Sequence, residues 1–462
     1  EITTFKNLVN EKGSDSSALD NMIEILVKGG INTFRALRMV LPPAWQNIHM
    51  MDPEIKSFHE YNSMHMEAWD GPAGIVMSDG RWAICLLDRN GLRPARYQID
   101  NEGYVTIASE IGVFPQDESN FITKGRIGAG GIFAIDTETG ELIDQSIIDS
   151  KLKEGKPYRA WLRSKAKYLE SSLYNYAGSG IKLISSVDLN KASKYFMLYT
   201  EERQSVIKPL AMDSSEGTGS MGDDTALAVV SSMPRQIYDF FRQQFAQVTN
   251  PPIDSLRESA VMSLETCFGP ELNIFEETPE HANRIVTSSP VLSHKKLNTL
   301  LKSKRFKSQE FNLVFSKSEA LEGALIKLGD KVKSAVKKGN VLIHLIEEMP
   351  VDNMLSINAL LATGYIHQQL INEGLRTDAN IIVSTASARD THSIACLISY
   401  GATAVYPWLA FQSILDLTNK GELKGSPTEN CAKYRKGINK GLLKIISKIG
   451  ISTISSYRPY KP

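Results

Sequence analysis

The stretch AGIVMSDGRWAICLLDRNGLRPARYQIDNEGYVTIASE, residues 73–110, decides the fold of the first part of the chain. Short apolar runs alternate here with tight-turn dipeptides, which are Asp79-Gly80, Asn90-Gly91 and Glu102-Gly103. This spacing predicts antiparallel strands joined by short turns. At the second turn, within LDRNGLRPARYQID, we expect Asp88 and Arg93 to pair across a hairpin, so that these charges are structural.

Helical patterns precede these strands. The segment GSDSSALDNMIEILVKGG, residues 13–30, has an apolar face at helical spacing, a candidate N-cap at Asp15 or Ser16, and a Gly-Gly end. A second helix is predicted over Thr33–Val40, where a Pro-Pro pair follows. The stretch GGIFAIDTETGELID, residues 130–144, predicts another hairpin. Helices beside antiparallel strands favour a layered α+β domain that ends near Glu170.

The second half of the chain has a different pattern. Residues 171–235 form a polar connector with little periodicity, and PRQIYDFFRQQFAQV, residues 234–248, is predicted to be helical. Three later apolar runs predict strands, namely NVLIHLI (340–346), NIIVST (380–385) and TAVYPW (403–408). HSIACLISYG, residues 392–401, predicts a helix that ends at Gly401. This alternation favours an α/β domain with parallel strands and right-handed crossovers.

Composition argues against several classes of protein. Lys+Arg 52 balances Asp+Glu 52 over 462 residues, so no overall charge attracts nucleic acid or an anionic membrane. No apolar run approaches the ~20 residues of a membrane span, and no signal peptide opens the chain. The cysteines lie far apart and predict reduced, buried cytosolic thiols, with neither a disulfide nor a metal site. They are Cys85, Cys267, Cys396 and Cys431.

Three motifs resemble functional sites, but a structural interpretation is favoured for each. The glycines of KGRIGAGGIFAID, residues 124–136, precede a strand, whereas a phosphate loop precedes a helix, so we expect a turn. His59 and His65 lack the spacing of a zinc pair on one helix face. In SARDTH, residues 387–392, Ser, Asp and His are adjacent, and a catalytic triad draws its members from separate elements. That motif is expected to cap a helix.

Two other features can each be interpreted either as functional or as structural. Asp15 could cap its helix, or its carboxylate could bind the ammonium group of a substrate. The loop EGTGSMGDDT, residues 216–225, could be a solvated linker or a loop that approaches a ligand closely. Residue types alone favour the cap for Asp15 and leave the choice open for the loop.

Long motifs nevertheless resemble one family, the glutamate synthases. The resemblance includes the segments already quoted around residues 13–30 and 73–110, and also MDPEIKSFHEYNSMHMEAWDGPAG. It continues through GSMGDDTALAVVS, FFRQQFAQVTNPPIDSLRESAVMSLE, ISYGATAVYPWLAFQSI and INKGLLKIISKIGISTISSYR. The match follows the order of the family's large chain over nearly the whole sequence. DRNGLRP followed by ASE is also similar to the phosphoribosyl amidotransferase of the purine pathway, whose other segments do not match.

The resemblance implies an enzyme that hydrolyses L-glutamine, channels the ammonia, and reductively aminates 2-oxoglutarate to L-glutamate. The implied cofactors are FMN and a 3Fe-4S cluster, with ligands mostly outside this chain. The implied electron donor is ferredoxin or a small subunit of NADPH/FAD type. An oligomer in the cytoplasm or plastid stroma is expected, with no nucleic acid and no membrane as partner.

The resemblance also implies roles for particular residues. Asp15 matches the aspartate that holds the α-amino group of glutamine, with Gly13 and Ser14 beside it. The loop at the tunnel mouth near the flavin corresponds to Ser220, Met221, Gly222 and Asp223. The nucleophilic cysteine would lie upstream of Glu1, so no catalytic residue is assigned in this chain, which is expected not to hydrolyse glutamine alone.

We therefore expect an interior fragment of a glutamate synthase large chain. Its predicted fold is an α+β layered sandwich of N-terminal-nucleophile type, present in part, followed by an α/β central domain. The predicted division is 1–170 (type-2 glutamine amidotransferase), 171–232 (connector), 233–425 (central domain) and 426–462 (start of the FMN-binding domain). The alternative is a non-catalytic scaffold or ligand-binding module derived from the same family.

Overall fold

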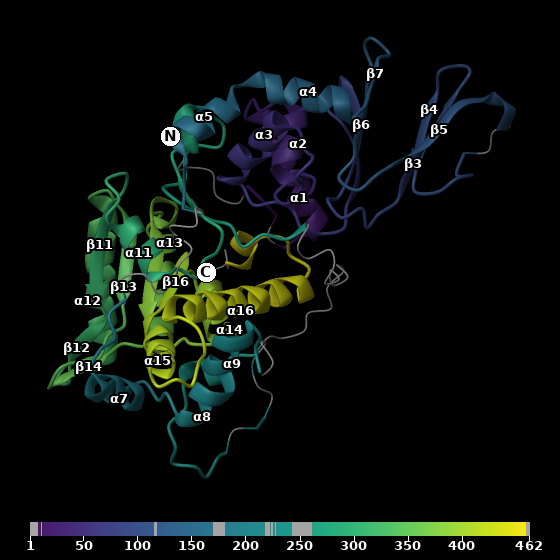
Figure 1. Ribbon diagram of the computed structural model, residues 1–462. Helices are drawn as coiled ribbons and strands as arrows, with labels where there is room; N and C mark the ends of the chain where they lie inside the picture. The colour runs from purple at the N-terminus through teal and green to yellow at the C-terminus, as the bar shows by residue number, and fades with distance from the viewer. Residues whose placement is uncertain are drawn as a thin grey trace.

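The computed structural model of the chain forms two parts that pack against each other (Figure 1). It describes residues 8–10, 12–114, 118–169, 181–217, 222, 225–226, 228–242 and 261–458. The first part contains helices and two antiparallel sheets, and the second is built around a parallel sheet. The fold is therefore of mixed α/β content.

The first part begins with three helices, α1 (Asp15–Lys28), α2 (Thr33–Val40) and α3 (Pro53–Ser63). Burial of Leu19, Ile23 and Leu26 on one side of α1 confirms the predicted apolar face. The predicted N-cap is wrong, because the Ser14 side chain accepts the Ser17 N–H and Asp15 is already the first helical residue. At the other end Gly30 has φ +93°, a conformation that suits glycine and stops the helix.

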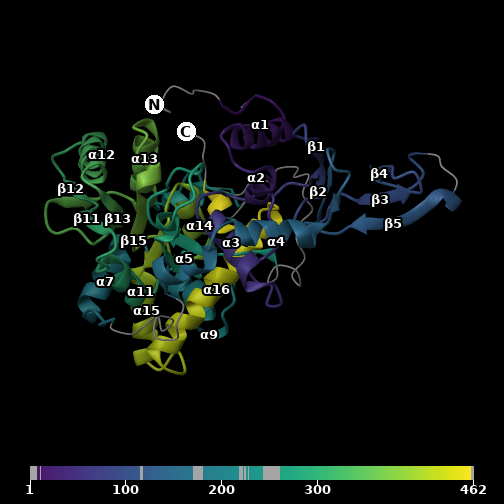
Figure 2. The same ribbon diagram turned by 90° about the horizontal axis from the view of Figure 1, so that it is seen from above.

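Two antiparallel sheets follow. The first has the order β1 (Gly74–Ser78), β2 (Trp82–Leu87), β6 (Ile132–Asp136), β7 (Leu142–Ile143). The second has the order β4 (Val105–Ala108), β3 (Ala95–Asp100), β5 (Phe121–Ile127), with the short helix η2 (Glu118–Asn120) before β5. The second sheet projects away from the rest of the molecule in both views (Figures 1 and 2). Hairpins at Asp79-Gly80, at Glu102-Gly103 and between β6 and β7 are confirmed, as is the glycine-rich turn between β5 and β6.

The segment 87–100 is not a hairpin, and this prediction was wrong. It leaves the first sheet at the end of β2 and enters the second sheet at β3, so the flanking strands do not pair. The Asp88 carboxylate accepts backbone N–H groups of Ala73, Asn90 and Leu92, with distances of 3.1–3.2 Å. Asp88 therefore folds the connection by binding main chain, and not by pairing with the side chain of Arg93.

The described residues on either side of 170–180 form helices and short strands. Helices α4 (Gln145–Gly155) and α5 (Tyr158–Lys165) pack against α3. Strand β8 (Lys167–Tyr168) then pairs in parallel with β10 (Ile285–Thr287), and β9 (Thr266–Phe268) pairs antiparallel with β10 to complete a three-stranded sheet. The stretch predicted as a polar connector contains helical segments, which are α7 (Ser186–Tyr195), α8 (Thr200–Glu202), η3 (Arg203–Ile207) and α9 (Lys208–Asp213). Of the predicted helix 234–248, the described residues form only the 3₁₀ turn η4 (Ile237–Phe240).

The second part confirms the α/β prediction. Its parallel sheet has the order β11 (Lys307–Asn312), β13 (Asn340–Ile346), β15 (Asn380–Thr385), β16 (Ala404–Pro407). The last three strands are the three apolar runs predicted from the sequence. A short antiparallel pair, β12 (Val314–Ser316) with β14 (Met354–Ser356), lies at one end.

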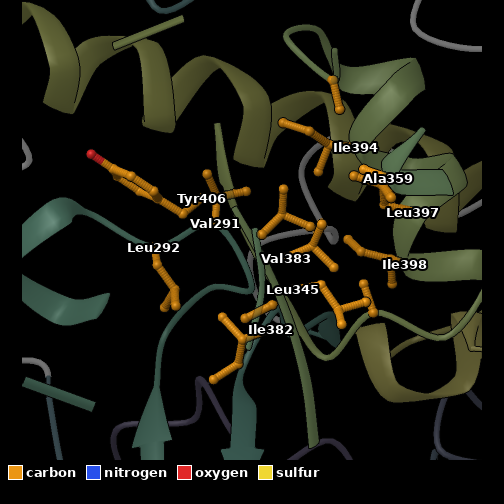
Figure 3. Close-up of a cluster of buried hydrophobic side chains, with 14 of the residues drawn as sticks. Val291, Leu292, Leu345, Ala359, Ile382, Val383, Ile394, Leu397, Ile398 and Tyr406 are labelled. Atoms are coloured by element: carbon orange, nitrogen blue, oxygen red, sulfur yellow. The ribbon is translucent and has the colours of Figure 1, made fainter. Parts of the chain in front are cut away.

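Helices surround this sheet and bury it. They are α11 (His294–Leu301), α12 (Leu321–Lys337), α13 (Ala359–Asn372), α14 (Thr391–Ser399), α15 (Trp408–Asn419) and α16 (Pro427–Lys448), with short helices η5 (Pro279–Ala282), η6 (Arg376–Asp378) and η7 (Ile454–Tyr457). Figure 3 shows side chains of β13 and β15, among them Leu345, Ile382 and Val383, packed beside Ile394 and Leu397 of α14. α14 ends before Gly401, as predicted. Among the described residues, no helix is both long and apolar enough to cross a membrane.

Candidate functional site

The N-terminal turn of α1 carries the first group of predicted site residues. Ser14 caps the helix through the Ser17 N–H at 3.2 Å, and its hydroxyl also lies 2.9 Å from that of Ser16. A Cβ on Gly13 would lie 2.6 Å from Nδ2 of Asn10, so only glycine fits this turn without displacing Asn10. Gly13, Ser14 and Asp15 are thus brought together at one exposed helix start.

Asp15 is exposed and does not cap the helix. One of its carboxylate oxygens accepts the adjacent Ser16 N–H at 2.8 Å. A carboxylate on the first turn of a helix is stabilised by the helix dipole in its charged form. This arrangement can present a negative charge to a cationic group such as an ammonium ion.

Glu216, the first residue of the motif 216–225, is bonded to the start of α14. The Glu216 carboxylate accepts the Thr391 N–H at 3.1 Å, and burial raises the pKa of Glu216. Gly222 has φ +90°, and a Cβ there would lie 2.9 Å from the Phe241 carbonyl oxygen and 3.1 Å from Cε1 of His392. The structure therefore brings Gly222 to the C-terminal side of the parallel sheet, while Ser220, Met221 and Asp223 lie outside the described residues.

A buried carboxylate organises this same side of the sheet. Glu347 follows β13 directly and is 1% exposed. Its oxygens accept hydrogen bonds from the backbone N–H groups of Ala359, Ala386 and Ser387 at 2.9 Å and from the hydroxyl of Thr385 at 2.8 Å. The sequence-based analysis missed this residue, although a glutamate directly after an apolar strand is a usable signal. Ligands of open α/β sheets bind outside the carboxyl ends of the strands, which is where Glu347 lies.

The residues of SARDTH have separate structural roles. Asp390 caps α14 by accepting the Ser393 N–H at 2.9 Å, as predicted. The Ser387 hydroxyl donates to Glu347, and the His392 ring lies 3.0 Å from the Tyr238 carbonyl oxygen through Nε2. The three side chains do not converge, which confirms the structural interpretation.

The charged motif after β2 connects distant segments of the chain. Arg89 is 4% exposed, donates to Oε1 of Gln46 at 3.2 Å, and approaches Asp70 to 3.9 Å. The same Asp70 accepts the Ser452 N–H at 3.0 Å. Through Asp70, Arg89 helps to join the first part of the chain to the C-terminal segment.

The two histidines considered for metal binding have separate partners. His59 is 2% exposed beside the Trp45 ring, and burial together with Arg38 and Arg89 lowers its pKa to about 3. His65 contacts the His281 carbonyl oxygen at 2.8 Å and Glu271 at 3.1 Å. Over the part of the chain that the structure describes, no group of three or more His, Cys, Asp or Glu side chains could hold a metal ion.

Comparison with known proteins agrees with this architecture. The family model of the glutamate synthase central domain matches residues 191–461, and that of class-II glutamine amidotransferases matches residues 1–161. A structure of a flavocytochrome b2 mutant with pyruvate covers 37% of this chain and 38% of its own, with a TM-score of 0.25 and 15% identity. That score does not support an argument about the fold.

Curated relatives match nearly all of the chain. Ferredoxin-dependent glutamate synthase 2 of Arabidopsis thaliana is 39% identical over 98% of this chain and 29% of its own length. The glutamate synthase [NADPH] large chain of Bacillus subtilis is 36% identical over 99% of this chain and 30% of its own length. The chain thus spans less than a third of either relative. Because the central-domain model alone covers more than half of its residues, the chain belongs to the glutamate synthase family.

Proposed function

We propose that this chain is part of a glutamate synthase, in which L-glutamine is hydrolysed and its ammonia is used to aminate 2-oxoglutarate reductively to L-glutamate. The observation that carries the proposal is the succession of a class-II amidotransferase match and a central-domain match in one chain. A scaffold without catalysis is the second candidate, but no feature of the described residues favours it.

In this proposal Asp15 binds the α-ammonium group of glutamine, and Gly13 and Ser14 shape the turn that holds it. The capping role of Ser14 supports this assignment, because it leaves the exposed Asp15 carboxylate available to a ligand. The nucleophilic cysteine is proposed to belong to another segment of the full-length protein. The proposed fold around this site is the partial layered sandwich of N-terminal-nucleophile type over residues 1–170.

The central part is proposed to lead ammonia toward the flavin, with the loop Ser220, Met221, Gly222 and Asp223 at the tunnel mouth. When bound, FMN would supply the hydride that reduces the imine. The positive φ of Gly222 and its tight contact with Phe241 fit a loop that brings its backbone close to a ligand. We further propose residues 171–232 as connector, 233–425 as central domain and 426–462 as the start of the FMN-binding domain.

The cysteines of this chain do not fit a 3Fe-4S cluster. All four are free and occupy separate positions, and burial raises the pKa of Cys396 and of Cys431 to about 12. Cluster ligands are thiolates, so a raised thiol pKa opposes this role. We propose that the cluster ligands lie elsewhere in the full-length protein, which receives electrons from ferredoxin or a NADPH/FAD-type subunit in the cytoplasm or plastid stroma, as an oligomer.

The substitution Asp15→Ala in the full-length enzyme tests the glutamine site. Losing a hydrogen-bonded ion pair is expected to lower kcat/KM for glutamine by about 10- to 100-fold, mainly through KM. Steady-state glutaminase kinetics measure this effect. Asp20→Ala, which removes another exposed carboxylate from the same helix, is the matched control. An unchanged KM in Asp15→Ala would remove Asp15 from the site.

A further inference from the structure

A cavity of about 690 Å³ lies where the two parts of the chain meet. Trp45 and residues 63–67 contribute the wall from the first part. Ser263 and residues 271–274, the end of α13, and the C-terminal residues Thr453 and Arg458 contribute the walls from the second part. A molecule bound in this cavity would therefore contact both parts at once.

Two guanidinium groups face this cavity, and they are held differently. All three nitrogens of Arg376 donate within the protein, to His367 Nδ1 at 2.9 Å and to the carbonyl oxygens of Ala379 and Gly401 at 2.6 and 3.0 Å. Arg458 has no such network, because its buried Nε finds no hydrogen-bond partner in the structure. Arg376 is thus fixed, while Arg458, which also lines the cavity, is not held by such a network.

The two arginines also repel each other. Burial, followed by the nearby positive charge of Arg458, lowers the pKa of Arg376 to about 10. Burial likewise lowers the pKa of Arg458, although Glu67 and Glu271 oppose the effect. Two like charges in a water-poor space are unfavourable unless an anion lies between them or nearby. A bound anion at this place would offset the electrostatic repulsion between the two guanidinium groups.

The carboxylates of the cavity wall do not fully supply that anion. Glu271 is already bound by Arg284 at 2.8 Å and by His65 at 3.1 Å. Burial raises the pKa of Glu67 to about 7, so a large share of this carboxyl group is neutral near pH 7. Glu265 also lines the cavity, near Cys267. These carboxylates therefore compensate the charge of Arg458 only in part.

We propose that this interface cavity binds a small organic carboxylate, whose anionic group pairs with Arg458. Planar guanidinium and carboxylate groups match in a two-bond geometry, and Arg376 adds positive charge without needing to move. The apolar side chains of Trp45, Met64 and Ile371 offer contact for a short carbon chain. This site is separate from Asp15 and Gly222, and it goes beyond the proposed reaction by giving the protein a means of sensing a carboxylate metabolite between its two parts.

Isothermal titration calorimetry on the purified chain tests the proposal, with 2-oxoglutarate, L-glutamate and inorganic phosphate as separate probes. At least one of the two carboxylates is expected to bind, and Arg458→Gln is expected to weaken its binding about tenfold or more. Arg458→Lys, which keeps the charge, should weaken it less. Arg163→Gln, which alters an exposed arginine on α5, should leave the affinity unchanged.

The ligand should also change the fluorescence of Trp45, and Trp45→Phe should abolish that change. This second measurement does not depend on whether Arg458→Gln folds. Thermal unfolding of each variant checks the fold. Failure of both carboxylates to bind would overturn the proposal, as would equal binding to the wild type and Arg458→Gln. Binding of phosphate alone would overturn the choice of a carboxylate. Since the readout is binding and not turnover, none of these outcomes bears on the proposed glutamate synthase activity.

Discussion

Glu67 is a residue whose charge responds to pH near neutrality. Burial raises its pKa to about 7 against the opposing charge of Arg458, and the neighbouring Glu271 contributes to the rise. The folded chain therefore binds a proton that the unfolded chain releases above the ordinary value of about 4.3. By linkage, this carboxyl group's contribution to stability falls as pH rises from about 4 to about 7, and it is constant above that range.

We accordingly predict that Glu67→Gln removes a decline in the free energy of unfolding between about pH 5 and pH 7. Urea unfolding at a series of pH values measures it. Other charged and titratable groups line the same cavity, namely Arg458, Glu265, Glu271, His65 and Arg376. The variant is therefore compared with the wild type at each pH, so that their contributions cancel. Glu154→Gln, at an exposed position, should reproduce the wild-type profile. Parallel profiles for Glu67→Gln and wild type would contradict the assignment.

The sequence predicted that the charged residues around Asp88 have a structural role, but it did not predict their contacts. The motif around Asp88 is recognisable, and its charges were correctly expected to be structural. The pairing partner was wrong, because the donors to the Asp88 carboxylate are main-chain N–H groups, whose position depends on the path between two sheets. The approach of Arg89 to Asp70 was not predicted either, nor was the bond from Ser452 to Asp70, since Ser452 is distant along the chain.

Gly222 is restricted both by its backbone conformation and by close packing. Gly222→Ala introduces both a strained φ and a contact of 2.9 Å with the Phe241 carbonyl oxygen. Gly339→Ala is a matched control, because Gly339 has φ +84° but nothing within 4 Å of its Cβ position. We predict a loss of about 1 kcal/mol for Gly339→Ala from strain alone.

The loss for Gly222→Ala should exceed that of the control by about 1–3 kcal/mol, because the substitution also overpacks the loop. Denaturant unfolding of the two variants gives the difference directly. In the full-length enzyme Gly222→Ala should also slow glutamate formation while glutamine hydrolysis continues. Equal stability of the two variants would show that the tight approach at Gly222 has no energetic consequence.

The carboxyl ends of β13 and β15 depend on Glu347. Glu347→Gln places an amide NH₂ group among donors, so at least one buried N–H or hydroxyl loses its acceptor. We predict a loss of about 2–3 kcal/mol in unfolding free energy. Glu348→Gln, at the next and less buried position, should change stability by less than about 0.5 kcal/mol. A small effect of Glu347→Gln would contradict the role given to this network.

Elements with strong local patterns were predicted correctly, and those that depend on tertiary packing were not. Strands β13, β15 and β16 are continuous apolar runs, and their existence follows from the sequence alone. The helices between residues 186 and 213 have no strong periodicity, yet α7 packs against α15 and α9 packs against α16. Such packing partners lie more than 200 residues away, beyond the range of local signals.

In the whole molecule, the first part completes its core with residues of the second. Ala282 and Val286 belong to the same buried cluster as Leu37 and Phe58. The Tyr61 hydroxyl donates to the Thr278 carbonyl oxygen at 2.9 Å. A division near residue 170 follows the change in sequence pattern but not the packing, because β8 pairs with β10 from the second part. The local sequence pattern predicts which helices and strands form, whereas contacts between distant segments determine the core in which each of them is buried.

The transfer of nitrogen between substrates tests the central claim most directly. The full-length protein that contains this chain is supplied with [amide-¹⁵N]glutamine, 2-oxoglutarate and a reduced electron donor, and the products are analysed by NMR spectroscopy. The proposed function predicts ¹⁵N at the α-amino position of glutamate formed from 2-oxoglutarate, together with unlabelled glutamate from glutamine. Unchanged glutamine, or label found only in free ammonium, would contradict it.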